Sequence, residues 1–262
     1  MLLVIDVGNT NTVIGIFQDR QLITDWRIRT ERNTTEDEFN ALIVTLFTGS
    51  GIAPGAISRT IISSVVPTVV NILDAFCRRY LGHAPRWVDP RHASPMPILL
   101  PNPAEVGADR IVNAVAAYHR YGQSLIVIDF GTATTFDAIS TAGEYLGGAI
   151  SPGIMISAEA LFMKASKLPR VEIFSAPRHV VGTDTIESMQ SGLIFGYAGL
   201  VDGMVRRMRA EMQTAPKVIA TGGLAPLMAD VAESIDHVET DLTLEGLRLI
   251  DEMMNSDSSR KT

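Results

Sequence analysis

The chain has 262 residues, of which 46% are hydrophobic and 19% charged; its 22 Lys and Arg against 29 Asp and Glu give a formal net charge of −7. This composition excludes a disordered chain, and the length suits one large or two medium domains. The acidic balance argues against a protein that coats nucleic acid, because contacts to phosphates need a basic surface. We therefore expect no nucleic-acid partner.

The cysteine count and the hydrophobic runs indicate a soluble cytoplasmic protein. Cys77 is the only cysteine, so it has no intramolecular disulfide partner and indicates no oxidising compartment. It lies in an apolar run of helical character, where we expect it to pack in the core. The first residues reach Asp6 too early for a signal peptide. No run approaches the ~18–20 apolar residues of a membrane helix, so we expect no membrane partner.

In chain order, the first half is predicted to form three strands, a helix, a strand and a second helix. Apolar, partly β-branched runs predict the strands. Thr35 and Glu38 form a capping box before the first helix, and Gly49 follows it. Pro67 stands at a favoured first position of the second helix. The predicted elements are strands 2–5, 13–17 and 22–28, helix 39–47, strand 59–66 and helix 67–82.

The second half is predicted to repeat this order. A Pro-rich loop, 85–103, precedes it and is long enough to cover a site. The polar tail, 255–262, is expected to fray. The predicted elements are strands 125–128, 136–140 and 145–151, helices from about 152 and over 184–212, strand 216–221 and a helix from about 225.

An internal repeat links the two halves. Asp6–Thr12 (DVGNTNT) aligns with Asp129–Thr135 (DFGTATT), and each copy follows four aliphatic residues and precedes a second strand. Ser63–Pro67 corresponds in the same way to Thr221–Pro226. We therefore predict an α/β fold of two duplicated domains, residues 1–118 and 119–262, that face each other across a central cleft.

An Asp-x-Gly turn at the end of a strand, followed by Thr or Asn, suits phosphate binding. The glycine lets backbone N–H groups approach an anion, and the hydroxyl and amide groups add donors. The carboxylate is placed to hold a cation or its bound water. Two such turns can clamp a triphosphate. The alternative is a pair of ordinary polar hairpin turns, in which Asp and Asn bond their own backbone.

Other nucleotide-binding motifs are absent from the sequence. None of the four lysines follows a glycine, which excludes a Walker A loop. No G-x-G-x-x-G fingerprint follows the first strand. A bound triphosphate would therefore be held by backbone groups, hydroxyls and cations.

A third segment, Asn102–Arg110, leads into a predicted helix. Asp109 and Arg110 stand at its start, where the helix N-terminus and the guanidinium both favour an anionic ligand. The alternative is that Asp109 is only a capping or first-turn acid and that Arg110 is solvated. The residues alone leave both interpretations open.

Together these motifs resemble those of type III pantothenate kinases, in the family's order over nearly the whole chain. The motifs are Asp6–Thr12, Gly107–Arg110, Asp129–Thr135, Gly147–Gly153, Gly182–Thr185, Met189–Gly192 and Thr221–Gly223. The resemblance implies an actin- and sugar-kinase-like (ribonuclease H-like) fold. It also implies ATP-dependent phosphorylation of pantothenate to 4′-phosphopantothenate, the first step of coenzyme A biosynthesis, with Mg²⁺, a monovalent cation (K⁺ or NH₄⁺) and a homodimer.

The resemblance further implies a role for each residue that matches a motif. Asp109 would be the catalytic proton acceptor, Asp6 would lie near Mg²⁺, and Asp129 would bind the monovalent cation. ATP would contact Thr132 and the turn made of Asp6, Val7, Gly8, Asn9, Thr10, Asn11, Thr12 and Val13. Pantothenate would contact Leu100, Gly107, Ala108, Asp109, Arg110 and, across the dimer interface, Thr185. Leu100 stands where the family usually has Tyr, so one hydroxyl is missing from this set.

Two other functions stay open from the sequence. One is a regulatory protein on the same scaffold, catalytically weak or inactive; the intact acids Asp6, Asp109 and Asp129 and the acidic charge weigh against it. The other is a kinase for another small hydroxyl substrate. The segments Gly107–Arg110 and Gly147–Gly153 favour pantothenate.

Overall fold

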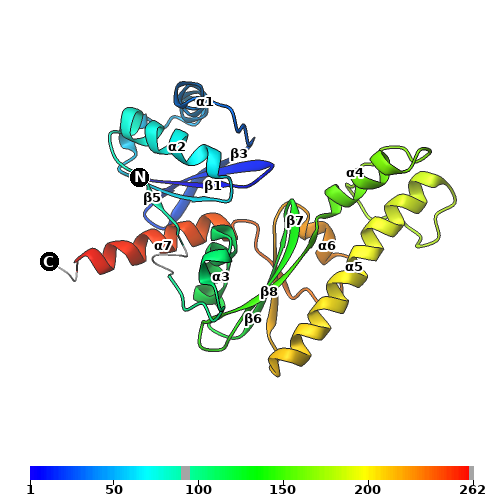
Figure 1. Ribbon diagram of the computed structural model, residues 1–262. Helices are drawn as coiled ribbons and strands as arrows, with labels where there is room; N and C mark the ends of the chain where they lie inside the picture. Colours follow the sequence, from blue (N-terminus) through cyan, green and yellow to red (C-terminus); the bar gives the residue numbers. More distant parts are fainter. Residues whose placement is uncertain (90–94, 260–262) are drawn as a thin grey trace. The chain divides into compact units, whose positions relative to one another are not determined.

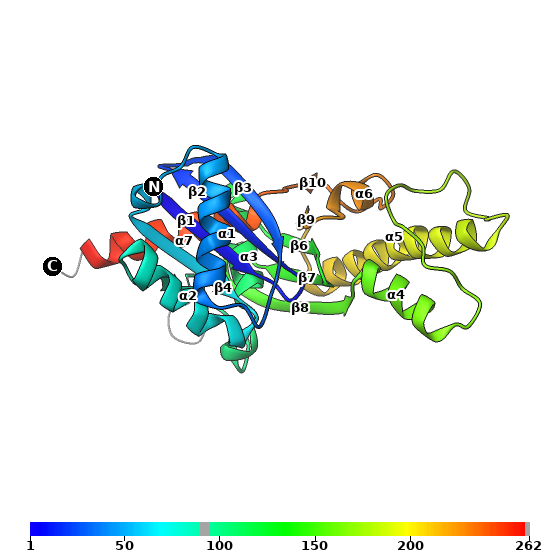
Figure 2. The same ribbon diagram turned by 90° about the horizontal axis from the view of Figure 1, so that it is seen from above.

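Each half of the chain builds a five-stranded mixed sheet. The computed structural model describes residues 1–89 and 95–259 (Figures 1 and 2). Contacts between Cα atoms divide the chain into two units. The first consists of Met1–Met96, Pro101–Ala116 and Thr243–Thr262, and the second of Pro97–Leu100 and Ala117–Leu242.

The first unit is organised around β1, whose aliphatic residues are buried on both faces of the sheet. The strand order is β3-β2-β1-β4-β5. β1 pairs antiparallel with β2 and parallel with β4, so it is the central strand. The strands are β1 (Leu2–Val7), β2 (Asn11–Gln18), β3 (Gln21–Arg29), β4 (Arg59–Ser64) and β5 (Arg86–Trp87).

Helices cover both faces of this sheet. α1 and α2 lie on one face, and α3 and α7 lie on the other (Figures 1 and 2). Thr35 and Glu38 form the predicted capping box of α1. The helices are α1 (Glu36–Gly49), α2 (Val70–Phe76), α3 (Ala108–Tyr121) and α7 (Leu242–Ser259), with short helical turns η1 (Pro54–Ala56), η2 (Pro67–Val69), η3 (Cys77–Leu81, a π-helix) and η4 (Pro103–Glu105).

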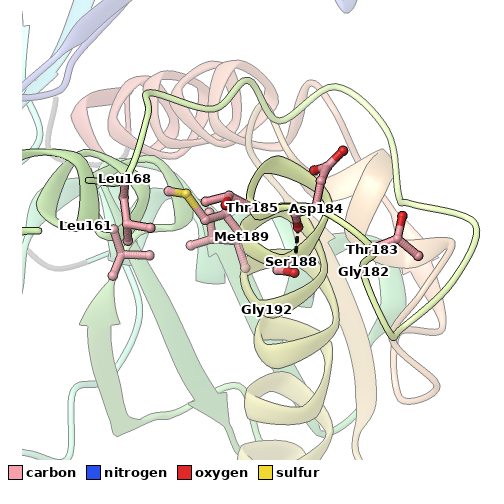
Figure 3. A pocket seen from close by; sticks show the side chains of 10 residues that line it. Leu161, Leu168, Gly182, Thr183, Asp184, Thr185, Ser188, Met189 and Gly192 are labelled. Atoms are coloured by element: carbon pink, nitrogen blue, oxygen red, sulfur yellow. Dashed lines mark hydrogen bonds between the residues drawn. The ribbon is translucent and has the colours of Figure 1, made fainter.

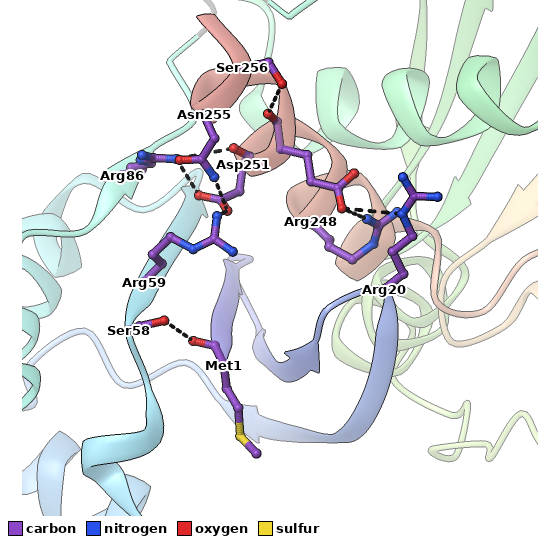
Figure 4. A network of polar contacts seen from close by, with 10 residues as sticks. Met1, Arg20, Ser58, Arg59, Arg86, Arg248, Asp251, Asn255 and Ser256 are labelled. Atoms are coloured by element: carbon purple, nitrogen blue, oxygen red, sulfur yellow. Dashed lines mark hydrogen bonds and ion pairs between the residues drawn. The ribbon is translucent and has the colours of Figure 1, made fainter. Parts of the chain in front are cut away.

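The C-terminal helix α7 belongs to the first unit, which differs from the expected domain range 119–262. Gly246 lies so close to Val112 of α3 that a Cβ there would collide with the Val112 backbone oxygen. Figure 4 shows the polar contacts of the helix: the fully buried Asp251 carboxylate accepts hydrogen bonds from Arg59 at 2.5 Å and Arg86 at 2.8 Å. These long-range contacts attach α7 to β4 and β5.

The expectation of a frayed tail over 255–262 is wrong for its first part. α7 continues to Ser259, and the side chain of Asn255 donates to Asp251 at 3.2 Å. Residues 260–262 lie outside the described part of the chain. A helix with its own buried acid explains the difference, because tertiary contacts outweigh the polar composition of the segment.

The second unit has the same strand arrangement, in the order β8-β7-β6-β9-β10. β6 pairs antiparallel with β7 and parallel with β9. Helices α4, α5 and α6 supply buried apolar side chains to a core on one face of the sheet. The elements are β6 (Leu125–Phe130), β7 (Ala133–Ile139), β8 (Tyr145–Pro152), β9 (Lys217–Thr221), β10 (His237–Val238), α4 (Ile154–Lys164), α5 (Thr185–Met212) and α6 (Ala225–Ala229).

The two sheets match strand for strand, which confirms the predicted duplication. Strands β1 to β5 correspond in order to β6, β7, β8, β9 and β10. The register agrees as well: Asp6 lies opposite Ser63 on the parallel neighbour of β1. Asp129 lies opposite Thr221 on the parallel neighbour of β6. The predicted correspondence of the segments after Ser63 and Thr221 is therefore confirmed.

Three smaller predictions have mixed outcomes. Cys77 is buried, as expected, and burial raises the pKa of its thiol to about 12. The Pro-rich stretch 85–103 contains the short strand β5 and the beginning of η4, while residues 90–94 lie outside the described residues. Among the helices of the described ranges, none is long and apolar enough to cross a membrane.

The buried acid of α7 gives a stability prediction. Asp251→Ala should lower the free energy of unfolding by about 2 kcal/mol, because two guanidinium groups lose a buried partner but stay partly exposed to water. Urea unfolding followed by circular dichroism measures the change. Asp74→Ala removes an exposed helical ion pair with Arg78 and should change the unfolding free energy by less than about 0.5 kcal/mol. Equal effects of the two substitutions would contradict the assigned role of Asp251.

Candidate active site

The first Asp-Gly turn joins β1 to β2 and is closed by backbone and side-chain hydrogen bonds. The Gly8 N–H donates to the Asn11 carbonyl at 3.0 Å, and a Cβ on Gly8 would already press on that oxygen. Thr30, just after β3, donates its hydroxyl to the Gly8 carbonyl at 2.8 Å. The side chains from Asn9 to Asn11 are exposed, whereas Thr12 is buried. The turn therefore presents polar groups outward from a braced backbone.

Asp6 ends the buried part of β1 and has a hydroxyl partner. The Ser63 side chain, fully buried on β4, donates to Asp6 Oδ1. Parallel pairing puts the two residues side by side at the carboxyl ends of their strands. A half-buried carboxylate in this position suits a hard cation or its bound water.

The segment Gly107–Arg110 lies beside the first turn in the same unit. Val65 bridges them: its N–H donates to the Val7 carbonyl at 3.1 Å, and a Cβ on Gly107 would lie 3.7 Å from Val65 Cγ1. That Cβ would also lie 2.5 Å from Asp109 Oδ1. A side chain at position 107 would therefore displace the Asp109 carboxylate from its present position.

Asp109 stands in the first turn of α3, as expected. Its Oδ1 accepts the backbone N–H of Arg110 at 2.8 Å. Burial raises the pKa of Asp109 above that of an ordinary aspartate, although the Arg110 N–H and guanidinium oppose the shift. A perturbed carboxyl at the start of a helix is a candidate general base.

The second Asp-Gly turn joins β6 to β7 and has the same closure. The Gly131 N–H donates to the Ala133 carbonyl at 3.1 Å. Asp129 lies against Gly222, where a Cβ would be 2.6 Å from Asp129 Oδ1. Gly222 also has φ +91°, a conformation that favours glycine. The motif Thr221–Gly223 therefore packs against the Asp129 carboxylate.

Thr132 of this turn is held by the segment between β8 and α4. The Gly153 N–H donates to the Thr132 carbonyl at 3.1 Å, and a Cβ on Gly153 would collide with that oxygen. Tyr197 of α5 fixes the segment, because its hydroxyl donates to the Pro152 carbonyl at 2.8 Å and bonds Ser157 at 2.5 Å. The last residue of the sequence motif Gly147–Gly153 is therefore hydrogen-bonded to the second turn.

Leu100 belongs to a short segment, Pro97–Leu100, that runs beside β8. Tyr145 anchors the segment through two backbone hydrogen bonds, one to Pro97 at 2.8 Å and one from Leu99 at 2.9 Å. A Cβ on Gly147, which has φ +119°, would lie 3.2 Å from Leu100 Cδ2. The phenol of Tyr145 donates to the buried Asp137 at 2.5 Å.

Thr185 begins α5 and lines a hollow of about 750 Å³ between α4 and α5. Figure 3 shows Leu161 and Leu168 on one side and Thr185 with Met189 on the other. Asp184 caps the helix by accepting the Glu187 N–H at 2.9 Å. The lining of the hollow combines apolar side chains with hydroxyl and carboxylate groups.

Within each unit the structure brings some expected residues together and separates others. In the first unit the turn Asp6–Val13 adjoins Gly107–Arg110. In the second, Asp129 and Thr132 share one turn, whereas Leu100 lies along β8 and Thr185 lines the hollow at α5. Sequence reasoning missed Thr30 and Tyr197, which act through hydrogen bonds to other residues and belong to no motif.

The acid of each Asp-Gly turn suits a cation that is shared with a phosphate ligand. Mg²⁺ is typically held by one or two carboxylates together with water and phosphate oxygens. In the described residues no three His, Cys, Asp or Glu side chains gather into a metal cluster. Single carboxylates such as Asp6 and Asp129, each beside a turn that contains one glycine, match this open kind of site.

The duplicated sheets and paired Asp-Gly turns define an actin-like kinase and ATPase fold. Two solved structures share it. One is a protein described as a conserved Baf family transcriptional activator from Campylobacter jejuni, with a TM-score of 0.61 and 18% identity over 97% of this chain and 99% of that one. The other is described as a 2-dehydro-3-deoxygalactonokinase from Sinorhizobium meliloti, with a TM-score of 0.59 and 11% identity over 97% of this chain and 99% of that one. The predicted fold class is confirmed.

Sequence comparison then gives the family. A model of the type III pantothenate kinase family matches residues 2–207. A type III pantothenate kinase from Desulfatibacillum aliphaticivorans is 67% identical over 257 residues, which cover 98% of this chain and 100% of that protein. The chain belongs to the type III pantothenate kinase family, as the motifs predicted.

The glycines around Asp129 give a matched pair of substitutions. Gly222→Ala should lower the melting temperature by about 4–8 °C, because a left-handed residue with a Cβ 2.6 Å from Asp129 Oδ1 costs about 2 kcal/mol. Gly131→Ala should change it by less than about 2 °C, because its Cβ would meet its nearest neighbour at 3.5 Å. Thermal unfolding of both variants measures the difference, and equal shifts would refute the packing described for Gly222.

Proposed function

We propose that the protein transfers the γ-phosphoryl group of ATP to the primary hydroxyl of pantothenate, forming ADP and 4′-phosphopantothenate in the first step of coenzyme A biosynthesis. Membership of the type III pantothenate kinase family, with 67% identity to one relative over nearly the whole chain, carries this proposal. ATP as donor is consistent with a cytoplasmic enzyme.

The first turn is proposed to hold the ATP phosphates. Residues 6–13 offer exposed Asn and Thr side chains on a glycine-containing backbone, which suits an anion. Asp6, hydrogen-bonded by Ser63, would hold Mg²⁺ or its water. Bound Mg²⁺ supplies positive charge to the phosphate oxygens, which this chain cannot supply with a Walker lysine.

Asp109 is proposed to accept the proton of the substrate hydroxyl. The hydroxyl oxygen forms a bond to the γ-phosphorus, the bond from that phosphorus to the oxygen bridging it to the β-phosphorus breaks, and ADP leaves. The proton passes to the Asp109 carboxylate. Burial makes this carboxylate a stronger base than an exposed aspartate. Gly107 leaves the space that its oxygen occupies.

The proposal also assigns residues that would bind a second cation, ATP and pantothenate. Asp129, which packs against Gly222, would hold a monovalent cation, K⁺ or NH₄⁺. Thr132 would contact ATP. Arg110 would pair with the carboxylate of pantothenate, beside Gly107 and Ala108. Leu100 would offer pantothenate an apolar contact without a hydroxyl.

A homodimer is proposed as well, with Thr185 close to its interface. Apolar side chains of α4 and of the segment between α4 and α5 are strongly exposed: Met163 by 69%, Phe174 by 80% and Val181 by 81%. Exposed apolar surface of this extent typically marks a protein interface. Sedimentation equilibrium would contradict the assembly if the molar mass were that of one chain.

The proposed reaction is tested by ADP release from ATP with pantothenate as acceptor. Turnover should require pantothenate and Mg²⁺ and should rise when K⁺ replaces Na⁺ in the buffer. A panel of other small alcohols separates pantothenate from alternative acceptors. Absence of pantothenate-dependent ADP release in potassium buffer would overturn the proposal. Faster turnover of another alcohol would show that this alcohol, and not pantothenate, is the substrate.

Asp109→Asn tests the proton acceptor. Turnover should fall at least about 100-fold, the usual contribution of a general base, while ATP binding stays within about twofold of the wild type. Because the folded-state pKa of Asp109 is raised, the charged form destabilises the fold; this penalty is absent below the ordinary carboxyl pKa and grows as pH rises through the raised one. The variant should therefore melt higher than the wild type at neutral pH, with the difference disappearing in acid.

Glu105→Gln is the matched control for this prediction. It removes an exposed charge from the neighbouring turn, where Asn102 donates to Glu105 at 2.8 Å. Its turnover should remain within about twofold of the wild type. Equal losses in the two variants would show that Asp109 acts only through the local charge.

A further inference from the structure

Thr30 makes three hydrogen bonds to the first turn, although it lies 18 residues or more from the residues it contacts through its side chain. Its N–H donates to the Thr10 carbonyl at 3.0 Å. Its hydroxyl donates to the Gly8 carbonyl at 2.8 Å. The same hydroxyl oxygen lies 2.9 Å from the hydroxyl of Thr12. Thr30 follows the last residue of β3, so the strand delivers it to the turn.

The proton positions in this group follow from chemistry. A hydroxyl has one proton and two lone pairs. The Thr30 proton is used on the Gly8 carbonyl, because a carbonyl can only accept. The proton between the two threonines must therefore come from Thr12, which donates to Thr30. The buried hydroxyl of Thr12 is thus part of the support of the turn.

The hydrogen bond to Gly8 fixes the orientation of one peptide group. In a planar trans peptide the carbonyl and the following N–H point in opposite directions. Since the Gly8 carbonyl points at Thr30, the N–H of Asn9 points away from Thr30. The Asn9 side chain is held separately, by a hydrogen bond from Arg32 at 3.1 Å. The Asn9 N–H is therefore aimed to the side of the turn opposite Thr30.

We propose that Thr30 is a positioning residue that locks the Gly8–Asn9 peptide so that the Asn9 N–H is presented to a phosphate of ATP. The proposal rests on the proposed function, in which residues 6–13 hold the ATP phosphates. Glycine at position 8 makes the lock necessary, because a glycine-containing peptide rotates with little steric resistance. Without the Thr30 hydroxyl the carbonyl can turn toward the phosphate and repel it.

The surroundings of Thr30 allow a clean substitution. It adjoins a small cavity of about 70 Å³ that is also lined by Val7, Ile28 and Phe39. Valine has the shape of threonine with a methyl group in place of the hydroxyl, so this methyl group takes the position of the Thr30 oxygen between the Gly8 carbonyl and the Thr12 hydroxyl. Thr30→Val therefore removes the two hydroxyl bonds and keeps the backbone bond to Thr10.

The experiment compares Thr30→Val, Thr30→Ser and Thr24→Val with the wild type. Calorimetric titration with a non-hydrolysable ATP analogue measures nucleotide affinity, and steady-state kinetics measure KM for ATP and for pantothenate. Thr30→Val should weaken analogue binding and raise KM for ATP by about three- to tenfold, the loss of roughly one net hydrogen bond. KM for pantothenate should stay within about twofold.

The other two variants distinguish an effect of the Thr30 hydroxyl on the turn from a general effect of substitution on protein stability. Thr30→Ser keeps the hydroxyl and should restore nucleotide affinity to within about twofold of the wild type. Thr24→Val makes the same chemical change on the same strand, opposite Ile16 and away from the turn, and should leave affinity unchanged. Unchanged affinity in Thr30→Val, failure of Thr30→Ser to restore it, or an equal loss in Thr24→Val would each overturn the proposal.

The same measurements distinguish this inference from the proposed function. Analogue binding that depends on Thr30, in a wild type that does not phosphorylate pantothenate, would support the inference and overturn the proposed acceptor. Pantothenate turnover with analogue affinity independent of Thr30 would do the opposite. A wild type that fails to bind the analogue would overturn the inference.

Discussion

Parallel pairing of each central strand with its inner neighbour is the constraint on which both Asp-Gly turns depend. It places a carboxylate and a hydroxyl-bearing residue side by side at the carboxyl ends of two strands, Asp6 with Ser63 and Asp129 with Thr221. The chain turns one residue after each acid, where Gly8 or Gly131 follows the end of the strand. The positions of the two acids and of their turns therefore follow from one arrangement, used twice.

The second consequence concerns Asp109. Its carboxylate adjoins the first turn through Val65 and occupies space that only a glycine at position 107 leaves open. Burial of this charge opposes stability and raises basicity by the same physical effect. A base that is stronger than an ordinary aspartate is thus obtained at the expense of fold stability, as is common at functional sites.

The sequence predicted what depends on local pattern. The Asp-Gly repeat revealed the duplication, the capping box located α1, and aliphatic runs located the central strands, whereas helix α7 was not predicted. The membership of α7 in the first unit could not be predicted, because it depends on Asp251 meeting Arg59 and Arg86 far away in the chain. Strands β5 and β10 have two residues each, too few for a periodic signal. Thr30 could not be predicted as a site residue, because a single threonine at the end of a strand belongs to no motif and its hydrogen-bond partners are visible only in the structure.

The position of α7 has a consequence for the order in which the protein forms. The first unit is assembled from three separate stretches of chain, and its last stretch follows the whole of the second unit. On the ribosome, residues 1–96 emerge first but lack the helix whose buried acid binds β4 and β5. The second unit is nearly continuous, and all its strands and helices leave the ribosome before α7. Synthesis therefore delivers the last layer of the half that carries Asp6 and Asp109 only after the half that carries Asp129 has been made, so N-terminal-first folding cannot complete the first unit.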